Sequence, residues 1–130
     1  MIYLDSSALV KLVFEEKESA ALADWLSGHQ DLPLISSALA TVEVLRTCRK
    51  INPVALWLAQ RIVDGLDLVA VDADVIRAAA LLEPSELRSL DALHLASALS
   101  VGSATVTFVS YVVRLSEAAA HAGLAVASPE

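Results

Sequence analysis

Short apolar runs that favour β-strands alternate with longer segments of helical character along this chain, and no other feature limits its fold so strongly. The runs lie at residues 2–4, 32–35, 66–71, 105–109 and 124–126. The segments between them predict helices at about 6–14, 18–26, 38–50, 53–65, 72–82 and 89–99, and a last helix that ends at Gly123. Strands that alternate with helices form βαβ units, which build a mostly parallel sheet with helices on both faces. The sequence therefore predicts an α/β fold, which we expect to form a single domain over residues 1–130.

The composition excludes several classes of protein. Hydrophobic residues make up 56% of the chain, far more than a disordered segment carries. Charged residues such as Lys11 and Glu15 interrupt the apolar stretches before they reach the roughly 18 to 20 residues that span a membrane. The first residues lack the basic region of a signal peptide, and the single cysteine, Cys48, has no disulfide partner within the chain. These features predict a cytoplasmic protein that does not enter the membrane.

The net charge of −7 argues at first against a nucleic-acid partner, because binding to a polyanion usually requires a basic surface. The argument loses force if several of the acids gather to hold divalent cations, since the bound ions then contact phosphate themselves. The distribution of charge is therefore more informative than its sum.

Three carboxylates stand in apolar surroundings where a solvent-facing acid is not expected. Asp5 ends the first strand, Glu43 lies in an Ala- and Val-rich helix, and Asp91 lies in a helix that is apolar on nearly every face. In a parallel sheet the active crevice lies outside the carboxyl ends of the strands, where Asp5 and Ser110 both fall. A buried carboxylate is costly unless it is paired, protonated or bound to a metal, and a divalent cation would remove the cost for all three acids. Ligation by oxygen alone, with no cysteine nearby, favours Mg²⁺ or Mn²⁺ over Zn²⁺.

Each acid also has an ordinary structural explanation. Asp5 and Asp91 could cap helices, because Asp is a favoured N-cap. Glu43 could pair with Arg46 or Thr47 one turn along its helix. Each explanation is reasonable alone, but the three acids together, one of them at a strand end, favour a shared cation.

Four segments of the chain resemble the motifs of PIN domains, in the same order and with similar spacing. They are residues 2–12, 37–44, 88–96 and 108–115. The first three hold Asp5, Glu43 and Asp91, and a PIN domain of this length resembles the VapC toxins of VapBC toxin–antitoxin pairs. The resemblance implies a PIN-like three-layer sandwich around a five-stranded parallel sheet, a homodimer, and RNA cleavage that depends on Mg²⁺ or Mn²⁺. It also implies neutralisation by a VapB-like antitoxin.

The fourth segment departs from the family pattern. PIN domains usually carry an Asp at the position of Val112, so only three of the four usual carboxylates are present. Ser7 and Ser110 could support the site with their hydroxyl groups, but neither replaces the missing charge. Glu117, the nearest acid downstream, lies about one helical turn too far along.

The acids suggest a mechanism that needs no protein nucleophile. Asp5 and Asp91 would bind the principal metal ion, and Glu43 would ligate it directly or hold one of its waters. A water activated by the metal would then attack the scissile phosphate in line. His94, one turn after Asp91, could transfer a proton, although a histidine on an apolar helix more often serves only to pack.

Basic side chains near the acids are candidates for binding RNA phosphates. One cluster lies on the helix of Glu43, and the other candidates are scattered along the chain. They are Arg46, Arg49, Lys50, Lys11, Arg88 and Arg114. The sequence does not distinguish tRNA, rRNA and mRNA as substrates.

Two other functions stay open. The absence of an acid at Val112 could leave a catalytically weakened PIN domain that acts mainly by binding RNA or its antitoxin. Asp5 could instead accept a phosphoryl group, but haloacid-dehalogenase-like enzymes place a second Asp two residues on, where this chain has Ser7.

Overall fold

The computed structural model describes residues 1–130, and most of its elements begin and end within a few residues of the predicted bounds. The strands are β1 (Ile2–Leu4), β2 (Leu34–Ser37), β3 (Asp67–Val69), β4 (Thr107–Val109) and β5 (Ala125–Ala127). The helices are α1 (Ser6–Val13), α2 (Ser19–Ser27), α3 (Leu39–Ile51), α4 (Leu56–Asp64), α5 (Ala73–Ala80), α6 (Ser89–Val101) and α7 (Val113–His121), with a 3₁₀ helix η1 (Pro53–Ala55) before α4. None of the helices combines the length and apolar character needed to cross a bilayer.

All strand pairs of the sheet are parallel, in the order β3-β2-β1-β4-β5, which confirms the predicted five-stranded parallel sheet. The chain builds β2 and β3 on one side of β1 and then crosses to build β4 and β5 on the other. The strand order therefore reverses between β1 and β4. In sheets of this kind a ligand crevice opens at the carboxyl ends of the strands beside the reversal.

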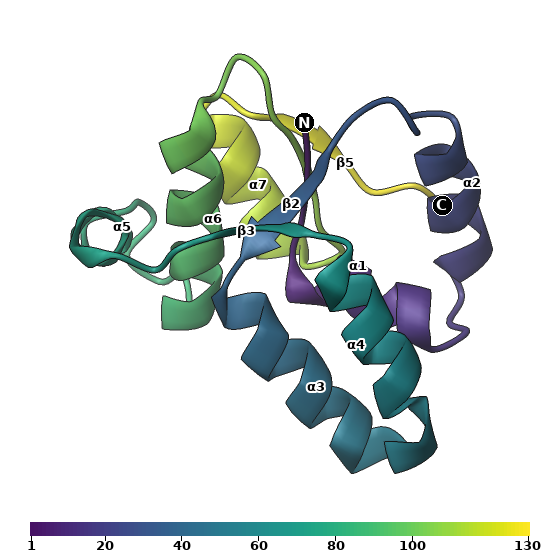
Figure 1. Ribbon diagram of the computed structural model, residues 1–130. Helices are drawn as coiled ribbons and strands as arrows, with labels where there is room; N and C mark the ends of the chain where they lie inside the picture. Colours follow the sequence, from purple (N-terminus) through teal and green to yellow (C-terminus); the bar gives the residue numbers. More distant parts are fainter.

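Helices cover both faces of the sheet and give the fold three layers (Figure 1). Successive side chains of a strand point to opposite faces, and all of β1 is buried. Ile2 and Leu4 pack with apolar residues of α1, α2, α3 and α4, whereas Tyr3 packs with residues of α6 and α7. The apolar character of β1 thus follows from burial on both sides, as in other parallel sheets.

One predicted strand is displaced along the sequence. The apolar run 32–35 predicts a strand that stops before Ser36, but β2 continues through Ser37. Both serines pair with β3, and Ser36 Oγ also donates a hydrogen bond to the carbonyl of Leu4 at 2.6 Å. Hydrogen bonds to neighbouring strands, which the sequence pattern does not reveal, therefore extend β2 into polar residues.

Candidate functional site

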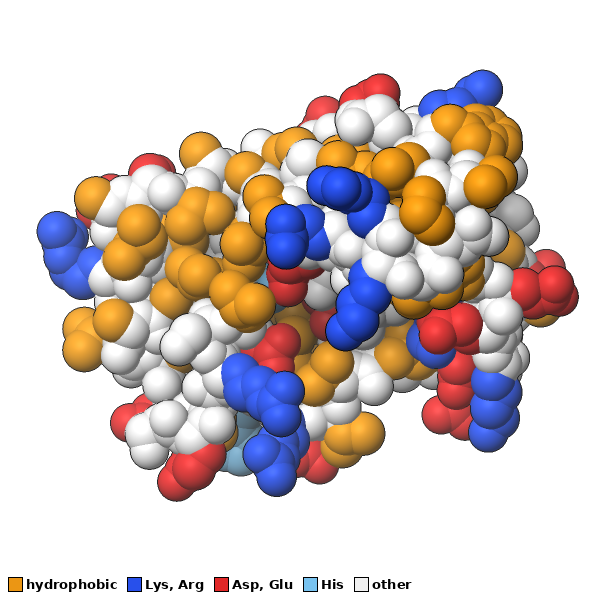
Figure 2. Space-filling view, turned by 90° about the horizontal axis from the view of Figure 1, so that it is seen from below, with side chains coloured by type: hydrophobic (Ala, Val, Ile, Leu, Met, Phe, Trp, Pro, Cys, Tyr) orange, Lys and Arg blue, Asp and Glu red, His pale blue; other side chains and the backbone are white.

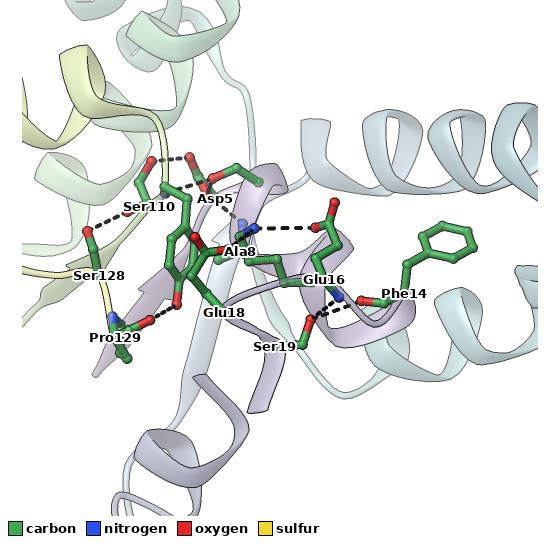
Figure 3. A network of polar contacts seen from close by, with 12 residues as sticks. Asp5, Ala8, Phe14, Glu16, Glu18, Ser19, Ser110, Ser128 and Pro129 are labelled. Atoms are coloured by element: carbon green, nitrogen blue, oxygen red, sulfur yellow. Dashed lines mark hydrogen bonds and ion pairs between the residues drawn. The ribbon is translucent and has the colours of Figure 1, made fainter. Parts of the chain in front are cut away.

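Asp5 lies at the carboxyl end of β1, where the chain turns into α1, and it is only 2% exposed. One carboxylate oxygen accepts hydrogen bonds from the amide of Ala8 at 3.0 Å and from Ser7 Oγ at 2.6 Å. The other accepts a hydrogen bond from Ser110 Oγ, just after β4, at 2.5 Å (Figure 3). Asp5 therefore caps α1, as the structural explanation of this residue predicts. It also lies where the strand order reverses, between β1 and β4.

The burial of Asp5 opposes its negative charge. Loss of hydration raises the pKa of this carboxyl above its ordinary value, and the hydrogen bonds from Ser110, Ser7 and Ala8 offset only part of the effect. No Lys or Arg forms an ion pair with Asp5. The fold thus holds this carboxylate by neutral donors alone and leaves its charge without a cation.

Helix α3 brings Glu43 to the same end of the sheet, with its side chain 19% exposed. Its Oε1 accepts a hydrogen bond from His94 Nε2 at 2.6 Å, and its Oε2 accepts one from Ser6 Oγ at 3.3 Å. The bonds to Arg46 or Thr47 that the sequence allowed are not formed. Glu43 is therefore oriented by residues of α6 and α1 and not by its own helix.

Asp91 lies in the first turn of α6 but does not cap the helix, because the N-cap is Arg88 and no side chain forms a capping hydrogen bond. Burial raises the pKa of Asp91, and the charges of Asp5 and Glu43 raise it further, whereas the charge of Arg88 lowers it. The three acids are thus close enough for their charges to interact. Asp91 differs from the other two in having no hydrogen bond or ion pair of its own.

In their chemistry, the three acids fit a divalent cation. All the donor atoms are carboxylate oxygens, the ligands that Mg²⁺ and Mn²⁺ prefer, and the only basic side chain bonded to any of them is His94. In their present positions, however, no group of three or more His, Cys, Asp or Glu side chains could hold a metal ion. Asp5 is held by serines and Glu43 by His94, whereas Asp91 has no hydrogen bond or ion pair, so Asp91 is the acid freest to move toward an ion shared by all three.

Val112, where the family pattern has an acid, lies on the wall of a pocket of about 660 Å³. Glu43, Asp91, Arg88 and Arg114 line the same pocket. Val112 is also the N-cap residue of α7, and its side chain makes no capping hydrogen bond. A carboxylate at this position would therefore share a pocket with two of the three remaining acids.

Basic residues surround the acids at the carboxyl end of the sheet. Figure 2 views this end and shows acidic side chains in a hollow with Lys and Arg side chains around it. Arg46, Arg49 and Lys50 line a pocket of about 490 Å³ on α3, while Arg88 and Arg114 lie beside the acids. These five predicted phosphate ligands form no ion pair within the chain.

Lys11 differs from the other basic candidates because its charge is already compensated. Its Nζ forms ion pairs with Glu18 at 2.8 Å and with Glu16 at 3.4 Å, and it lies 4.8 Å from the centre of the Tyr111 ring. Its side chain is only 12% exposed. Figure 3 draws both glutamates in the same network of polar contacts as Asp5.

The sequence interpretation missed two members of the network around the acids. Ser6 bonds to Glu43, and the hydroxyl of Tyr3 lies 2.8 Å from His94 Nδ1. For His94 the sequence did carry a signal, because it lies three residues after Asp91 and this spacing places both side chains on one face of α6. No sequence pattern relates Tyr3 to His94, because that contact depends on how α6 packs on the sheet.

Comparisons with known proteins agree on one family. The family model of the PIN domain matches residues 2–109. The chain is 47% identical to the ribonuclease VapC35 of Mycobacterium tuberculosis, over 99% of this chain and 97% of that protein. It is 43% identical to the ribonuclease VapC46 of the same species, over 98% of this chain and 97% of that protein.

Solved structures with low sequence identity share the fold. A VapBC2 structure from Rickettsia felis, bound to a DNA fragment from its promoter, matches with a TM-score of 0.72 at 15% identity and covers 100% of both chains. FitAcB from Neisseria gonorrhoeae matches with a TM-score of 0.69 at 19% identity, over 99% of this chain and 98% of that chain. At such identities the likeness shows the fold alone.

Replacement of Asp5 by Asn should raise the melting temperature of the metal-free protein at neutral pH. The amide keeps an oxygen for Ala8 and Ser7 but removes the buried charge. A carboxyl whose pKa is raised by folding destabilises the folded state once the pH rises above the ordinary pKa of an Asp side chain, which is about 3.9. The difference between the two melting temperatures should therefore disappear at lower pH. Added Mn²⁺ should stabilise the wild type but not the variant.

Asp72→Asn is the matched control, because Asp72 caps α5 in the same way but is exposed. Its melting temperature should stay close to that of the wild type, since Asp and Asn are similar caps. A lower melting temperature for Asp5→Asn at neutral pH would contradict the argument.

Proposed function

The chain belongs to the PIN domain family, and we propose that it is a toxin ribonuclease of the VapC type that cuts RNA with Mg²⁺ or Mn²⁺. The observation that carries the proposal is the gathering of Asp5, Glu43 and Asp91 at the carboxyl edge of the sheet. These acids come from three different elements, and none forms an ion pair with Lys or Arg. The identity to two ribonucleases along nearly the whole chain supports the proposal.

We assign the three carboxylates as the metal-binding and catalytic residues. Asp5 and Asp91 are the primary ligands, and Glu43 binds the ion directly or through a water. A divalent cation in this place supplies a water of lowered pKa and positive charge for the scissile phosphate. Ser7 and Ser110 hold the Asp5 carboxylate by the hydrogen bonds described above.

The basic residues around the acids are proposed to contact RNA phosphates. Arg46, Arg49 and Lys50 lie along α3, and Arg88 and Arg114 line the pocket of Asp91. Contacts of this kind position a nucleic acid without reading its bases. A local basic rim of this kind would reconcile RNA binding with the net charge of −7.

We further propose that the protein acts in the cytoplasm as a homodimer and pairs with a VapB-like antitoxin. The shared fold with the VapBC2 and FitAcB structures supports the pairing, and exposed apolar side chains such as Val54 and Trp57 suit protein contacts. Light scattering should give twice the chain mass of 13.7 kDa for the purified protein. A larger complex should appear after coexpression with the product of the adjacent gene, whereas a monomer in solution would exclude the homodimer.

Cleavage of total RNA by the purified chain tests the enzymatic proposal. Fragments should appear with Mn²⁺ or Mg²⁺, disappear with EDTA and return when Mn²⁺ is added back. Rising salt should weaken RNA binding, because phosphate contacts release counterions. RNA cleavage that persists in excess EDTA would exclude the metal-dependent reaction.

Asp91→Asn is the control variant for the cleavage assay, because its carboxylate has no hydrogen-bond partner within the chain and its loss should disturb the fold least. Loss of a direct ligand should reduce the cleavage rate at least about 100-fold, beyond the 10- to 100-fold typical of residues that only support a ligand. A variant as active as the wild type would exclude Asp91 from the site.

A weakened enzyme that acts mainly by binding RNA or the antitoxin is the second candidate function. The observation in its favour is Val112, a neutral residue on the wall of the pocket that holds Glu43 and Asp91. One carboxylate fewer lowers the affinity of an oxygen site for divalent ions. The proposed nuclease and the weakened enzyme differ in how much activity an added acid restores.

Val112→Asp should raise both Mn²⁺ affinity and the rate of RNA cleavage if the native site is weakened. The substitution also adds an N-cap to α7, which stabilises a helix by about 0.5–2 kcal/mol. Val112→Asn separates the two effects, because it supplies the cap without the charge. A large gain for Asp alone favours the weakened enzyme, whereas equal cleavage by all three proteins shows that three acids suffice.

A further inference from the structure

We propose that His94 is a positioning residue that holds the carboxylate of Glu43 at the site, and that Tyr3 supports it by donating a hydrogen bond to the opposite ring nitrogen. The consequence of this positioning for metal binding rests on the proposed function. The relay of hydrogen bonds from Tyr3 through His94 to Glu43 concerns only the folded chain.

His94 lies between two partners, one on each ring nitrogen. Its Nε2 is 2.6 Å from Glu43 Oε1, and its Nδ1 is 2.8 Å from the hydroxyl of Tyr3. The residue is 1% exposed, so water does not compete for either nitrogen. The relay links β1 and α6 to α3, and thus joins the two helical layers across the edge of the sheet.

The partners select one tautomer of the neutral imidazole ring. A neutral imidazole carries its hydrogen on one nitrogen and accepts at the other. The Glu43 carboxylate only accepts, so Nε2 must donate to it. Nδ1 must then accept from the hydroxyl of Tyr3, which lies 2.8 Å away and can donate.

Tyr3 is a rigid source for this hydrogen bond. It belongs to β1, is fully buried, and its ring stacks on Phe108 with the centroids 5.2 Å apart and the planes 7° apart. It also meets the ring of His94 edge-on, with centroids 5.9 Å apart. The sheet therefore fixes Tyr3, Tyr3 fixes the orientation of His94, and His94 fixes the oxygen of Glu43 that it contacts.

Glu43 depends on this support because little else holds it. Its remaining hydrogen bond, from Ser6, is longer at 3.3 Å. The side chain borders an open pocket of about 800 Å³ into which it could otherwise turn. Removal of a group that orients a metal ligand by a hydrogen bond, without contacting the metal itself, typically reduces metal affinity or activity by about 10- to 100-fold.

Nitrogen NMR of the metal-free protein at neutral pH tests the relay directly. The ¹⁵N chemical shifts of the His94 ring should identify Nε2 as protonated and Nδ1 as unprotonated. Tyr3→Phe should leave Nε2 protonated, because Glu43 still requires a donor there, but it should shift the Nδ1 resonance by removing the hydrogen bond that Nδ1 accepts. A hydrogen on Nδ1 of the wild type, whether or not Nε2 also carries one, would overturn the proposal.

Titration with Mn²⁺ tests the consequence for the site. His94→Leu should weaken Mn²⁺ binding about 10- to 100-fold. His94→Gln should stay close to the wild type, because its amide can still donate to Glu43. Melting temperatures of both variants identify any general loss of structure. Equal Mn²⁺ affinity in the wild type and His94→Leu, or equal losses in both variants, would overturn the positioning role.

The outcomes keep this proposal separate from the proposed function. If the wild type binds no Mn²⁺ and cuts no RNA, the proposed function fails, while the ring-nitrogen shifts still decide whether His94 donates to Glu43. If the wild type cuts RNA but His94 carries its hydrogen on Nδ1, the relay fails and the nuclease stands.

Discussion

The burial of one carboxylate, Asp5, is the constraint on which the rest of this structure depends. A charged group at the end of a strand that is buried on both faces must find donors, and it finds them in α1 and in Ser110 after β4. These hydrogen bonds tie together the two central strands at the reversal of strand order. The same bonds leave the charge uncompensated, because every donor is neutral. The position that organises the edge of the sheet is therefore also the position most in need of a cation.

Stability and function make opposite demands on this edge. Three acids that act on one another raise the free energy of the metal-free fold, and a protein selected for stability alone would replace them. The chain instead keeps Arg88 and Arg114 beside the acids without pairing them. Positive charge near but not on the carboxylates leaves their oxygens available to an ion. It also leaves the arginines available to an anion.

The sequence was sufficient to predict what depends on local pattern. The alternation of strands and helices predicts the parallel sheet, and the strand ends predict that Asp5 and Ser110 meet. Contacts that depend on how one helix packs beside another could not be predicted, as the bond between His94 and Glu43 shows. The end of β2 was also missed, because Ser36 is polar in sequence but hydrogen-bonded inside the sheet. Local patterns thus revealed the acids, while only the packing revealed what holds each of them.

The three acids are not held equally, and this gives the missing fourth acid a specific meaning. Asp5 is fixed by serines and Glu43 by His94, whereas Asp91 has no partner and shares its pocket with Val112. A carboxylate at 112 would add repulsion to an Asp91 whose pKa is already raised by burial and by two neighbouring charges. Valine removes that repulsion in the metal-free protein. It also removes a potential ligand beside Asp91, the one acid that no hydrogen bond holds in place. Under the proposed function, binding of an ion would therefore depend more heavily on Asp5 and Glu43, the two carboxylates that hydrogen bonds already hold.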